Sequence, residues 1–155
     1  VLKTGMVGVQ YIYDALSVAG RADLAFNMIT QSSPGYRNWY ENGATTLWEL
    51  WNGKEKYSHN HHMFSAVIGW FFKSLLGIQP TLDAPAFEKI ELAPRFVKEV
   101  GYAKGEMQTV KGKIAIDWKY EDGKFVYNVE IPSGINATYN GETLKVGKNQ
   151  FIIKE

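Results

Sequence analysis

The chain has 155 residues, a formal net charge of +1 and no cysteine. This length suffices for one ordinary domain or two small ones, and the near-neutral charge gives no basic field that would indicate nucleic acid as a partner. Without cysteine there are no disulfides or thiolate metal sites, and the cellular compartment stays open. The most apolar run, Met63–Ile78, is interrupted by Lys73 and is too short to span a bilayer.

Apolar residues recur at helical spacing near the start of the chain. One stripe covers Val9–Leu16 and is followed by Gly20, a residue that commonly ends a helix. A second stripe lies within Arg21–Gln31. The sequence therefore predicts two amphipathic helices in this region.

A third helical pattern, Met63–Leu76, is apolar almost all round. We expect a helix that is buried on most sides, capped by Ser58 or Asn60 and ended by Gly77. Three helices cannot bury this much apolar surface by themselves, so we expect more protein on the N-terminal side of the same chain. The alternative is that the helices pack on the rest of this chain or self-associate with a second copy.

The segment Ser32–Tyr57, between the second and third helices, is predicted to be non-helical because it is rich in glycine, proline and asparagine turn signals. It also carries an unusual density of aromatic residues. A long aromatic loop is a candidate binding loop, since binding residues concentrate on loops held by a scaffold.

The pattern changes to a period of two from about residue 79. Ile114–Tyr120 and Phe125–Ile131 alternate on either side of Asp122–Gly123, which is a strong hairpin signal, and Asn140–Gly141 offers a second tight turn. Further strands are expected at Glu88–Leu92, Tyr102–Gln108, Ala137–Tyr139, Glu142–Val146 and Phe151–Ile153. The sequence predicts an α+β chain, with helices in residues 1–78 and an antiparallel β-sandwich of six or seven strands in residues 79–155.

Glu49 is the first candidate for chemistry. It lies in the run GATTLWELW, beside Trp48 and close to Trp51. Indole rings exclude water from a carboxyl group, which suits acid–base chemistry, and their flat faces stack on sugars. The alternative is a partly exposed glutamate beside two structural tryptophans.

The second candidate is the histidine cluster in Ser58–His62. His59, His61 and His62 lie close together, but no further ligands stand at a spacing typical of zinc, so no metal site is expected. A histidine that hydrogen-bonds a substrate hydroxyl fits the pattern better, and capping of the following helix by Asn60 is the alternative.

Four runs carry a family resemblance, in this order along the chain: TGMVGVQYIYDALSVAGRADLAFNMI, GATTLWELW, SHNHHMFSAVIGWFF and IELAPRFVKEVGYAKGEMQTVKGKIAIDW. They resemble the C-terminal part of bacterial α-L-rhamnosidases, glycoside hydrolase family 78. The resemblance implies the last helices of an (α/α)6 catalytic barrel followed by a C-terminal β-sandwich. It also implies an inverting hydrolysis of terminal α-L-rhamnose from glycosides or polysaccharides, with no cofactor.

The resemblance assigns roles to individual residues. Glu49 corresponds to the general base, His61 to the histidine that contacts the bound rhamnose, and Trp48 and Trp51 to the substrate-binding surroundings. The general acid of the family belongs to an upstream motif that this sequence does not contain. The chain departs from the family at His59, where an apolar or aromatic residue is common, and in a shorter segment between Glu49 and His61.

Two other interpretations stay open. One is a part of a different (α/α)6 glycoside hydrolase or lyase, and the other is a non-catalytic carbohydrate-binding or structural module.

Overall fold

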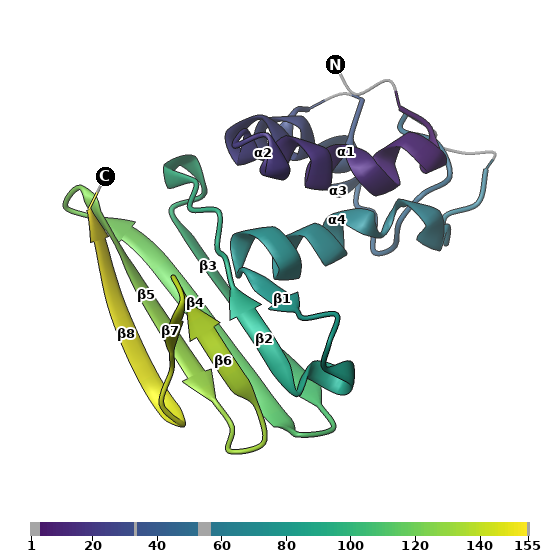
Figure 1. Ribbon diagram of the computed structural model, residues 1–155. Coiled ribbons are helices and arrows are strands. Elements are labelled where there is room, and N and C mark those ends of the chain that lie inside the picture. Colours follow the sequence, from purple (N-terminus) through teal and green to yellow (C-terminus); the bar gives the residue numbers. More distant parts are fainter. Residues whose placement is uncertain (1–3, 33, 53–56, 155) are drawn as a thin grey trace. The chain divides into compact units, whose positions relative to one another are not determined.

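The structure is a computed structural model that describes residues 4–32, 34–52 and 57–154 (Figure 1). It divides into two compact units, Val1–Trp70 and Phe71–Glu155, which we call the helical unit and the sheet unit. No helix in the described ranges is both long and apolar enough to cross a membrane.

The helical unit contains the two helices predicted first. Helix α1 spans Met6–Val18 and buries Val9 and Tyr13, and helix α2 spans Ala22–Thr30 and buries Ala25 and Ile29. Both predictions are confirmed, and the expected stop after α1 is also confirmed. Gly20 follows the helix with a φ of 75°, in the left-handed region that ends helices.

The prediction that Ser32–Tyr57 is entirely non-helical is wrong at its start. A short helix, α3, spans Tyr36–Glu41. Tyr36, Trp39 and Tyr40 stand at the i, i+3 and i+4 positions of one helix face, and Trp39 is only 2% exposed. Burial of Trp39 overrides the glycine and proline signals on either side, while Tyr40 is 81% exposed.

The third predicted helix is divided into three pieces. A 3₁₀ turn spans His62–Phe64, helix α4 spans Ala66–Trp70, and a π-helical turn spans Phe71–Leu75. The expected cap at Ser58 or Asn60 is wrong, because the first turn begins after His61 without a side-chain cap. The expected stop at Gly77 is confirmed by its φ of 81°.

The end of the π-helical turn is held by two hydrogen-bond donors of the sheet unit. The indole Nε1 of Trp118 donates a 2.7 Å hydrogen bond to the carbonyl oxygen of Leu75. The hydroxyl of Tyr127 donates a 3.1 Å hydrogen bond to the carbonyl of Leu76, and burial raises the pKa of that hydroxyl. These two donors satisfy carbonyls that the end of a helix leaves without partners.

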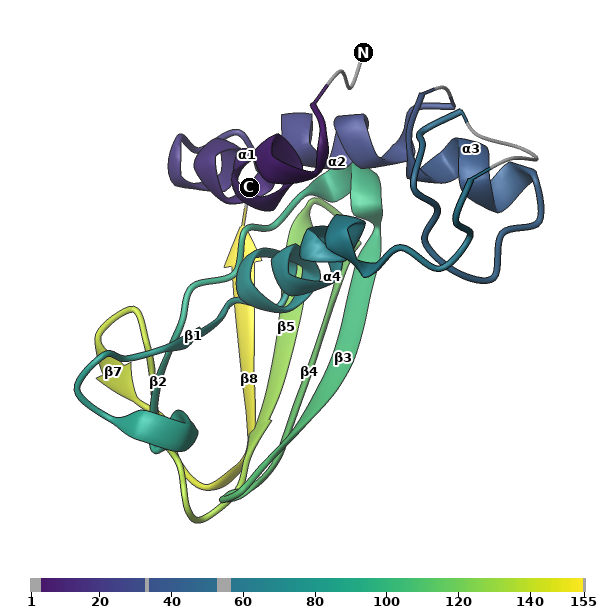
Figure 2. The same cartoon turned by 90° about the vertical axis from the view of Figure 1, so that its right-hand side faces the viewer.

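The sheet unit consists of two four-stranded sheets in two layers, which Figure 2 shows in side view. One sheet has the order β1-β2-β6-β7 and the other the order β3-β4-β5-β8. The strands span Ile78–Pro80 (β1), Lys89–Leu92 (β2), Tyr102–Thr109 (β3), Gly112–Glu121 (β4), Lys124–Ile131 (β5), Asn136–Tyr139 (β6), Glu142–Thr143 (β7) and Gly147–Lys154 (β8).

The predicted hairpins at Asp122–Gly123 and Asn140–Gly141 are confirmed. Two details differ from the expectation. Strand β1 was not predicted because its three residues are too few to show a period, and β2 pairs with β6 in parallel rather than antiparallel. The chain passes through β3, β4 and β5 of the other sheet before it returns to β6, so a parallel pairing becomes available.

The core of the sheet unit lies between the two layers. Ile90 and Leu92 of one sheet are buried, as are Ile116 and Trp118 of the other. The rings of Tyr127 and Tyr139 join the layers, with centroids 5.5 Å apart. The alternation that predicted the strands is therefore the alternation between this core and solvent.

Gly77 is the position at which this packing is least tolerant of a side chain. A Cβ there would stand 2.3 Å from the backbone nitrogen of Pro94, and its φ is also positive. Gly123 has a similar φ of 73° but open space around it. We predict that Gly77→Ala lowers the free energy of unfolding by about 2–5 kcal/mol, and Gly123→Ala by about 1–2 kcal/mol. Chemical denaturation followed by tryptophan fluorescence measures both, and equal losses would contradict this packing.

Helix α1 carries a second apolar stripe that faces away from its buried side. Val7, Tyr11 and Val18 share one helix face and are 69%, 67% and 82% exposed. Exposed stripes of this kind drive association. We predict that the 155-residue chain self-associates as its concentration rises, and that replacing these three residues by serine suppresses the association.

Sedimentation velocity over a range of concentrations tests this prediction. The matched control replaces two apolar residues that are exposed on the sheet unit, Val110 and Ile152, by serine, and it is expected to leave the association unchanged. A monomer at every concentration, or equal effects of both sets of substitutions, would contradict a role for the α1 stripe.

Candidate functional site

Two segments of the aromatic loop lie side by side in the helical unit. The backbone N–H of Glu49 donates to the carbonyl of Ser58 at 2.9 Å, and the N–H of His61 donates to the carbonyl of Leu47 at 2.7 Å. The hydroxyl of Thr46 donates to the carbonyl of His59. Residues 46–49 and 58–61 thus form an antiparallel pair, which we call the paired loop. It brings the backbones of Glu49 and His61 onto one small structure.

The side chain of Glu49 is partly exposed and is held by the opposite segment. Its Oε2 accepts a 3.2 Å hydrogen bond from the backbone N–H of Ser58. The backbone N–H of Glu49 in turn donates to the carbonyl of Ser58, so two hydrogen bonds join Glu49 and Ser58. A carboxylate positioned in this way retains acceptor capacity for a proton.

The described carboxylates nearby in sequence have different partners. Asp23 is paired with Arg21 at 2.8 Å, and Glu41 is paired with Arg37 at 2.6 Å. The guanidinium of Arg21 lowers the pKa of Asp23 through its hydrogen bond. These two carboxylates are each held by a guanidinium, whereas the described partner of the Glu49 carboxylate is a backbone N–H.

His61 has an unsatisfied nitrogen. Its Nε2 is buried and has no hydrogen-bond partner among the described residues. The ring lies 6.4 Å from the ring of Phe64, centroid to centroid. A buried polar atom without a partner costs about 1–3 kcal/mol. A hydroxyl group of a ligand would remove this cost.

The side chain of Trp48, a residue of the paired loop, is buried rather than exposed to solvent. It is 6% exposed, and the imidazole of His59 stacks on it with centroids 4.3 Å apart and an angle of 14°. The ring of Trp39 contacts it as well, at 6.4 Å. His59 is exposed, so the flat surface that this stack presents to solvent is an imidazole.

Trp51 is anchored in the same aromatic cluster. It stacks on Trp39 with centroids 4.9 Å apart, and Tyr36 and Phe64 meet it edge to face. Its Nε1 donates to the carbonyl of Thr4 at 2.9 Å. The cluster also holds the backbone of the loop, because the Nε1 of Trp39 donates to the carbonyl of Leu50 at 2.9 Å.

Three contributors to this arrangement were not predicted from the sequence. Trp39 and Tyr36 were seen only as part of an aromatic loop, although their helical spacing could have identified α3 as its support. The backbone N–H of Ser58, which holds the carboxylate of Glu49, left no signal in the sequence.

A depression of about 350 Å³ lies beside the paired loop and is lined by Tyr36, Trp39, Tyr40, Ala44, Thr45, Thr46, Leu47 and Ile68. Of the four predicted site residues, none is among its described lining residues. Within the part of the chain that the structure describes, no three His, Asp or Glu side chains come together as a metal site would require.

Two family models match the chain. The bacterial α-L-rhamnosidase six-hairpin glycosidase domain matches residues 1–75, and the bacterial α-L-rhamnosidase C-terminal domain matches residues 77–147. The division between the two models falls close to the change from helices to strands.

Curated relatives carry the same description. An α-L-rhamnosidase of Alteromonas sp. (strain LOR) is 32% identical over 150 residues, which cover 89% of this chain and 16% of the relative. An α-L-rhamnosidase of Formosa agariphila is 33% identical over 142 residues, which cover 87% of this chain and 15% of the relative. The chain thus spans about a sixth of the length of these relatives.

Solved structures agree with this result. The α-L-rhamnosidase from Dictyoglumus thermophilum superposes with a TM-score of 0.85 at 26% identity, over 99% of this chain and 21% of that one. The Streptomyces avermitilis α-L-rhamnosidase complexed with L-rhamnose has a TM-score of 0.81 at 22% identity, over 99% and 17%, which shows a shared fold. With two domain models, curated relatives and solved structures in agreement, the chain belongs to the bacterial α-L-rhamnosidase family.

Proposed function

We propose that this chain is part of an enzyme that hydrolyses terminal α-L-rhamnose from glycosides or polysaccharides with inversion, and that Glu49 is its general base. Family membership supports the reaction class. The observation that carries the assignment to this loop is the buried Nε2 of His61, which has no hydrogen-bond partner among the described residues, on the structure that also holds Glu49.

In the proposed reaction, Glu49 takes a proton from water as that water attacks the anomeric carbon of rhamnose. A second carboxyl group protonates the departing glycosidic oxygen from the opposite side. Inverting enzymes place these two groups roughly 6.5–9.5 Å apart, which leaves room for the water. We propose that the acid lies in a part of the parent enzyme beyond these 155 residues, so this chain by itself is expected to be inactive.

The paired loop supports the base role through positioning. One hydrogen bond from the N–H of Ser58 holds the Glu49 carboxylate, and a second, from the N–H of Glu49 to the Ser58 carbonyl, holds its backbone. Correct placement supplies a large share of a catalytic effect. The described partner of the carboxylate is a backbone N–H at Oε2, and its second oxygen can accept a hydrogen bond from water.

We propose that His61 hydrogen-bonds a hydroxyl of the bound rhamnose through Nε2. Trp48 and Trp51 form the substrate-binding wall together with His61. Trp48 contributes through the imidazole of His59 that stacks on its ring, and Trp51 contributes by anchoring the loop. We further propose that residues 1–78 complete an (α/α)6 barrel with the rest of the parent enzyme and that residues 79–155 form its C-terminal domain. The exposed stripe on α1 would then be covered within the barrel.

Glu49→Gln in the intact enzyme is expected to lower kcat on an aryl α-L-rhamnoside by about 10²–10⁴-fold, because general base catalysis typically contributes that much. KM should change little, since the amide keeps the size of the side chain. Steady-state kinetics measures both constants, and circular dichroism checks the fold.

The matched control is Glu41→Gln, which removes an exposed, arginine-paired carboxylate of the same unit and should leave kcat unchanged. A folded Glu49→Gln enzyme that keeps more than about a tenth of the wild-type kcat would contradict the base role.

His61→Ala is expected to lower kcat/KM by about 10–100-fold, mostly through a higher KM, because a hydrogen bond to the sugar is lost. His62→Ala is the matched control, since this neighbour is exposed, and it should leave both constants near the wild-type values. Equal effects of the two substitutions, or no effect of His61→Ala, would show that His61 does not contact the substrate.

A further inference from the structure

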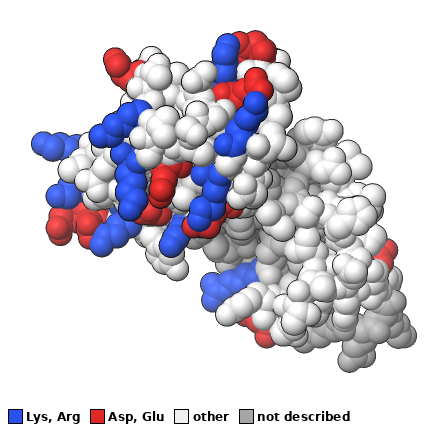
Figure 3. Space-filling view, turned by 90° about the horizontal axis from the view of Figure 1, so that it is seen from below, with Lys and Arg blue, Asp and Glu red and all other residues white. Residues whose placement is uncertain are grey.

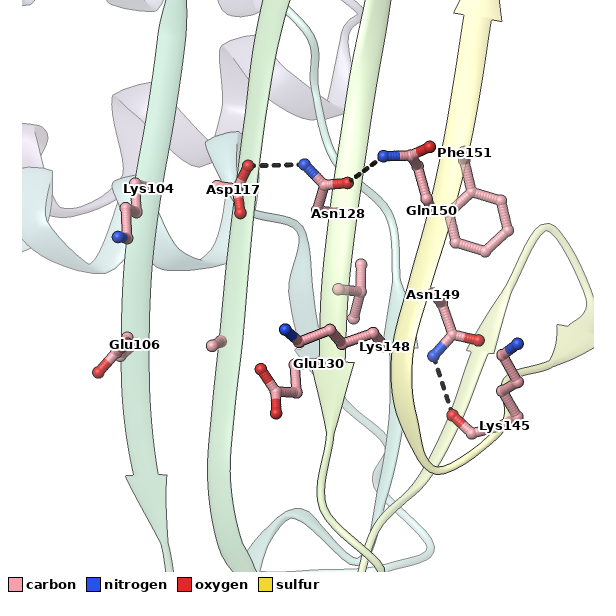
Figure 4. Close-up of a pocket in the computed structure, with 12 residues that line it drawn as sticks. Lys104, Glu106, Asp117, Asn128, Glu130, Lys145, Lys148, Asn149, Gln150 and Phe151 are labelled. Atoms are coloured by element: carbon pink, nitrogen blue, oxygen red, sulfur yellow. Dashed lines mark hydrogen bonds between the residues drawn. The ribbon is translucent and has the colours of Figure 1, made fainter.

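A hollow in the sheet unit lies on the outer face of the β3-β4-β5-β8 sheet. It has a volume of about 740 Å³. Lys104, Asp117, Asn128 and Gln150 are paired in register and form one row across all four strands (Figure 4). Adjacent strands are about 4.8 Å apart, so the row is about 14 Å long. We call this hollow the polar groove.

The middle of the row is tied together by side-chain hydrogen bonds. The Nδ2 of Asn128 donates to Asp117 Oδ1 at 2.8 Å, and the Nε2 of Gln150 donates to Asn128 Oδ1 at 2.8 Å. Each group keeps further capacity, because Asp117 has a second oxygen, Asn128 a second N–H, and Gln150 an oxygen and a second N–H. The ladder is therefore a fixed array of donors and acceptors on a partly buried surface.

The next row explains why the face is hollow. Register places Glu106, Ala115, Glu130 and Lys148 side by side. Ala115 is much smaller than the glutamates on either side of it, so the floor drops between them. Long charged side chains rise around a floor that carries carboxylate and amide groups, as Figure 4 shows.

The charges of the groove balance. Lys104, Lys145 and Lys148 stand against Glu106, Asp117 and Glu130 among its described lining residues. Figure 3 shows the same mixture over the sheet unit, where lysine and acidic side chains alternate in bands. A balanced field favours neither a polyanion nor a polycation.

We propose that the polar groove binds a neutral oligosaccharide. Carboxylate and amide groups in a fixed row can exchange hydrogen bonds with successive sugar hydroxyls, and the volume lies within the range of small-molecule sites. The choice of a rhamnose-terminated sugar rests on the proposed function. The groove would be a second sugar site, separate from the residues proposed to perform hydrolysis.

A ¹⁵N-HSQC titration tests this proposal on the 155-residue chain, at a concentration where it is monomeric. The probe is a neutral, rhamnose-terminated trisaccharide, with a uronate-containing trisaccharide of equal length as the comparison. The expected result is saturable shifts at the amides around Asp117, Asn128 and Gln150. The neutral sugar should bind more tightly than the acidic one.

Asn128→Ala breaks the ladder at its centre and is expected to weaken binding about fivefold or more. Asp117→Asn keeps the shape of the groove and provides a second variant. Gln108→Ala, at an exposed position of β3 that is not among the described lining residues, is the matched control and should change nothing. The dispersion of the spectrum shows that each variant is folded.

Three results would overturn the proposal: no shifts in the groove at saturating sugar, binding that both ladder variants leave unchanged, or tighter binding of the acidic trisaccharide. Failure of the proposed function is separately visible. It would appear as no rhamnose release from an aryl α-L-rhamnoside by the intact wild-type enzyme, whereas the groove is tested by sugar binding alone.

Discussion

The hydrogen-bonded pairing of residues 46–49 with residues 58–61 is the constraint on which the candidate site depends. It joins two segments whose side chains would otherwise be independent, and it does so with backbone groups that need partners in any case. The aromatic cluster of Tyr36, Trp39, Trp51 and Phe64 supports the pairing from below, and Trp39 adds a hydrogen bond to the loop backbone. The proposed base and the proposed sugar contact are thus placed by packing and by backbone geometry.

This arrangement gives the tryptophans a role different from that of simple sugar platforms. Trp48 is covered by His59, and Trp51 is fixed by its own hydrogen bond to Thr4. Their aromatic and hydrogen-bond contacts hold the loop, and we propose that Glu49 and His61 supply the polar groups that meet the sugar. Apolar support beneath a few placed polar groups is typical of a ligand site.

Much of the fold could be predicted from the sequence, because the period of the apolar residues reports the core directly. The hairpin of β4 and β5 follows from strict alternation around Asp122–Gly123. The short helix α3 and the three-residue strand β1 were missed because each is too short to show its period against strong turn signals. The parallel pairing of β2 with β6 depends on the order in which the chain visits two sheets, which no local pattern contains.

The candidate site was accessible from the sequence only in part. The run GATTLWELW and the histidines of Ser58–His62 identified the residue types, and the resemblance to the family supplied their roles. The amide of Ser58 against Glu49, and the stack of His59 on Trp48, are tertiary contacts between segments separated in the chain. The polar groove was not predicted from the sequence. Strand register brings its row of polar side chains together, and these residues are far apart in the sequence.

The most direct test of the central claim is azide rescue of the intact Glu49→Ala enzyme on an aryl α-L-rhamnoside. Removing the carboxylate opens space on the side from which water attacks, and azide needs no base. The account predicts little hydrolysis without azide, and with azide the formation of β-L-rhamnosyl azide, detected by NMR. Undiminished hydrolysis without azide, or formation of the α anomer, would contradict the placement of Glu49 opposite the departing group.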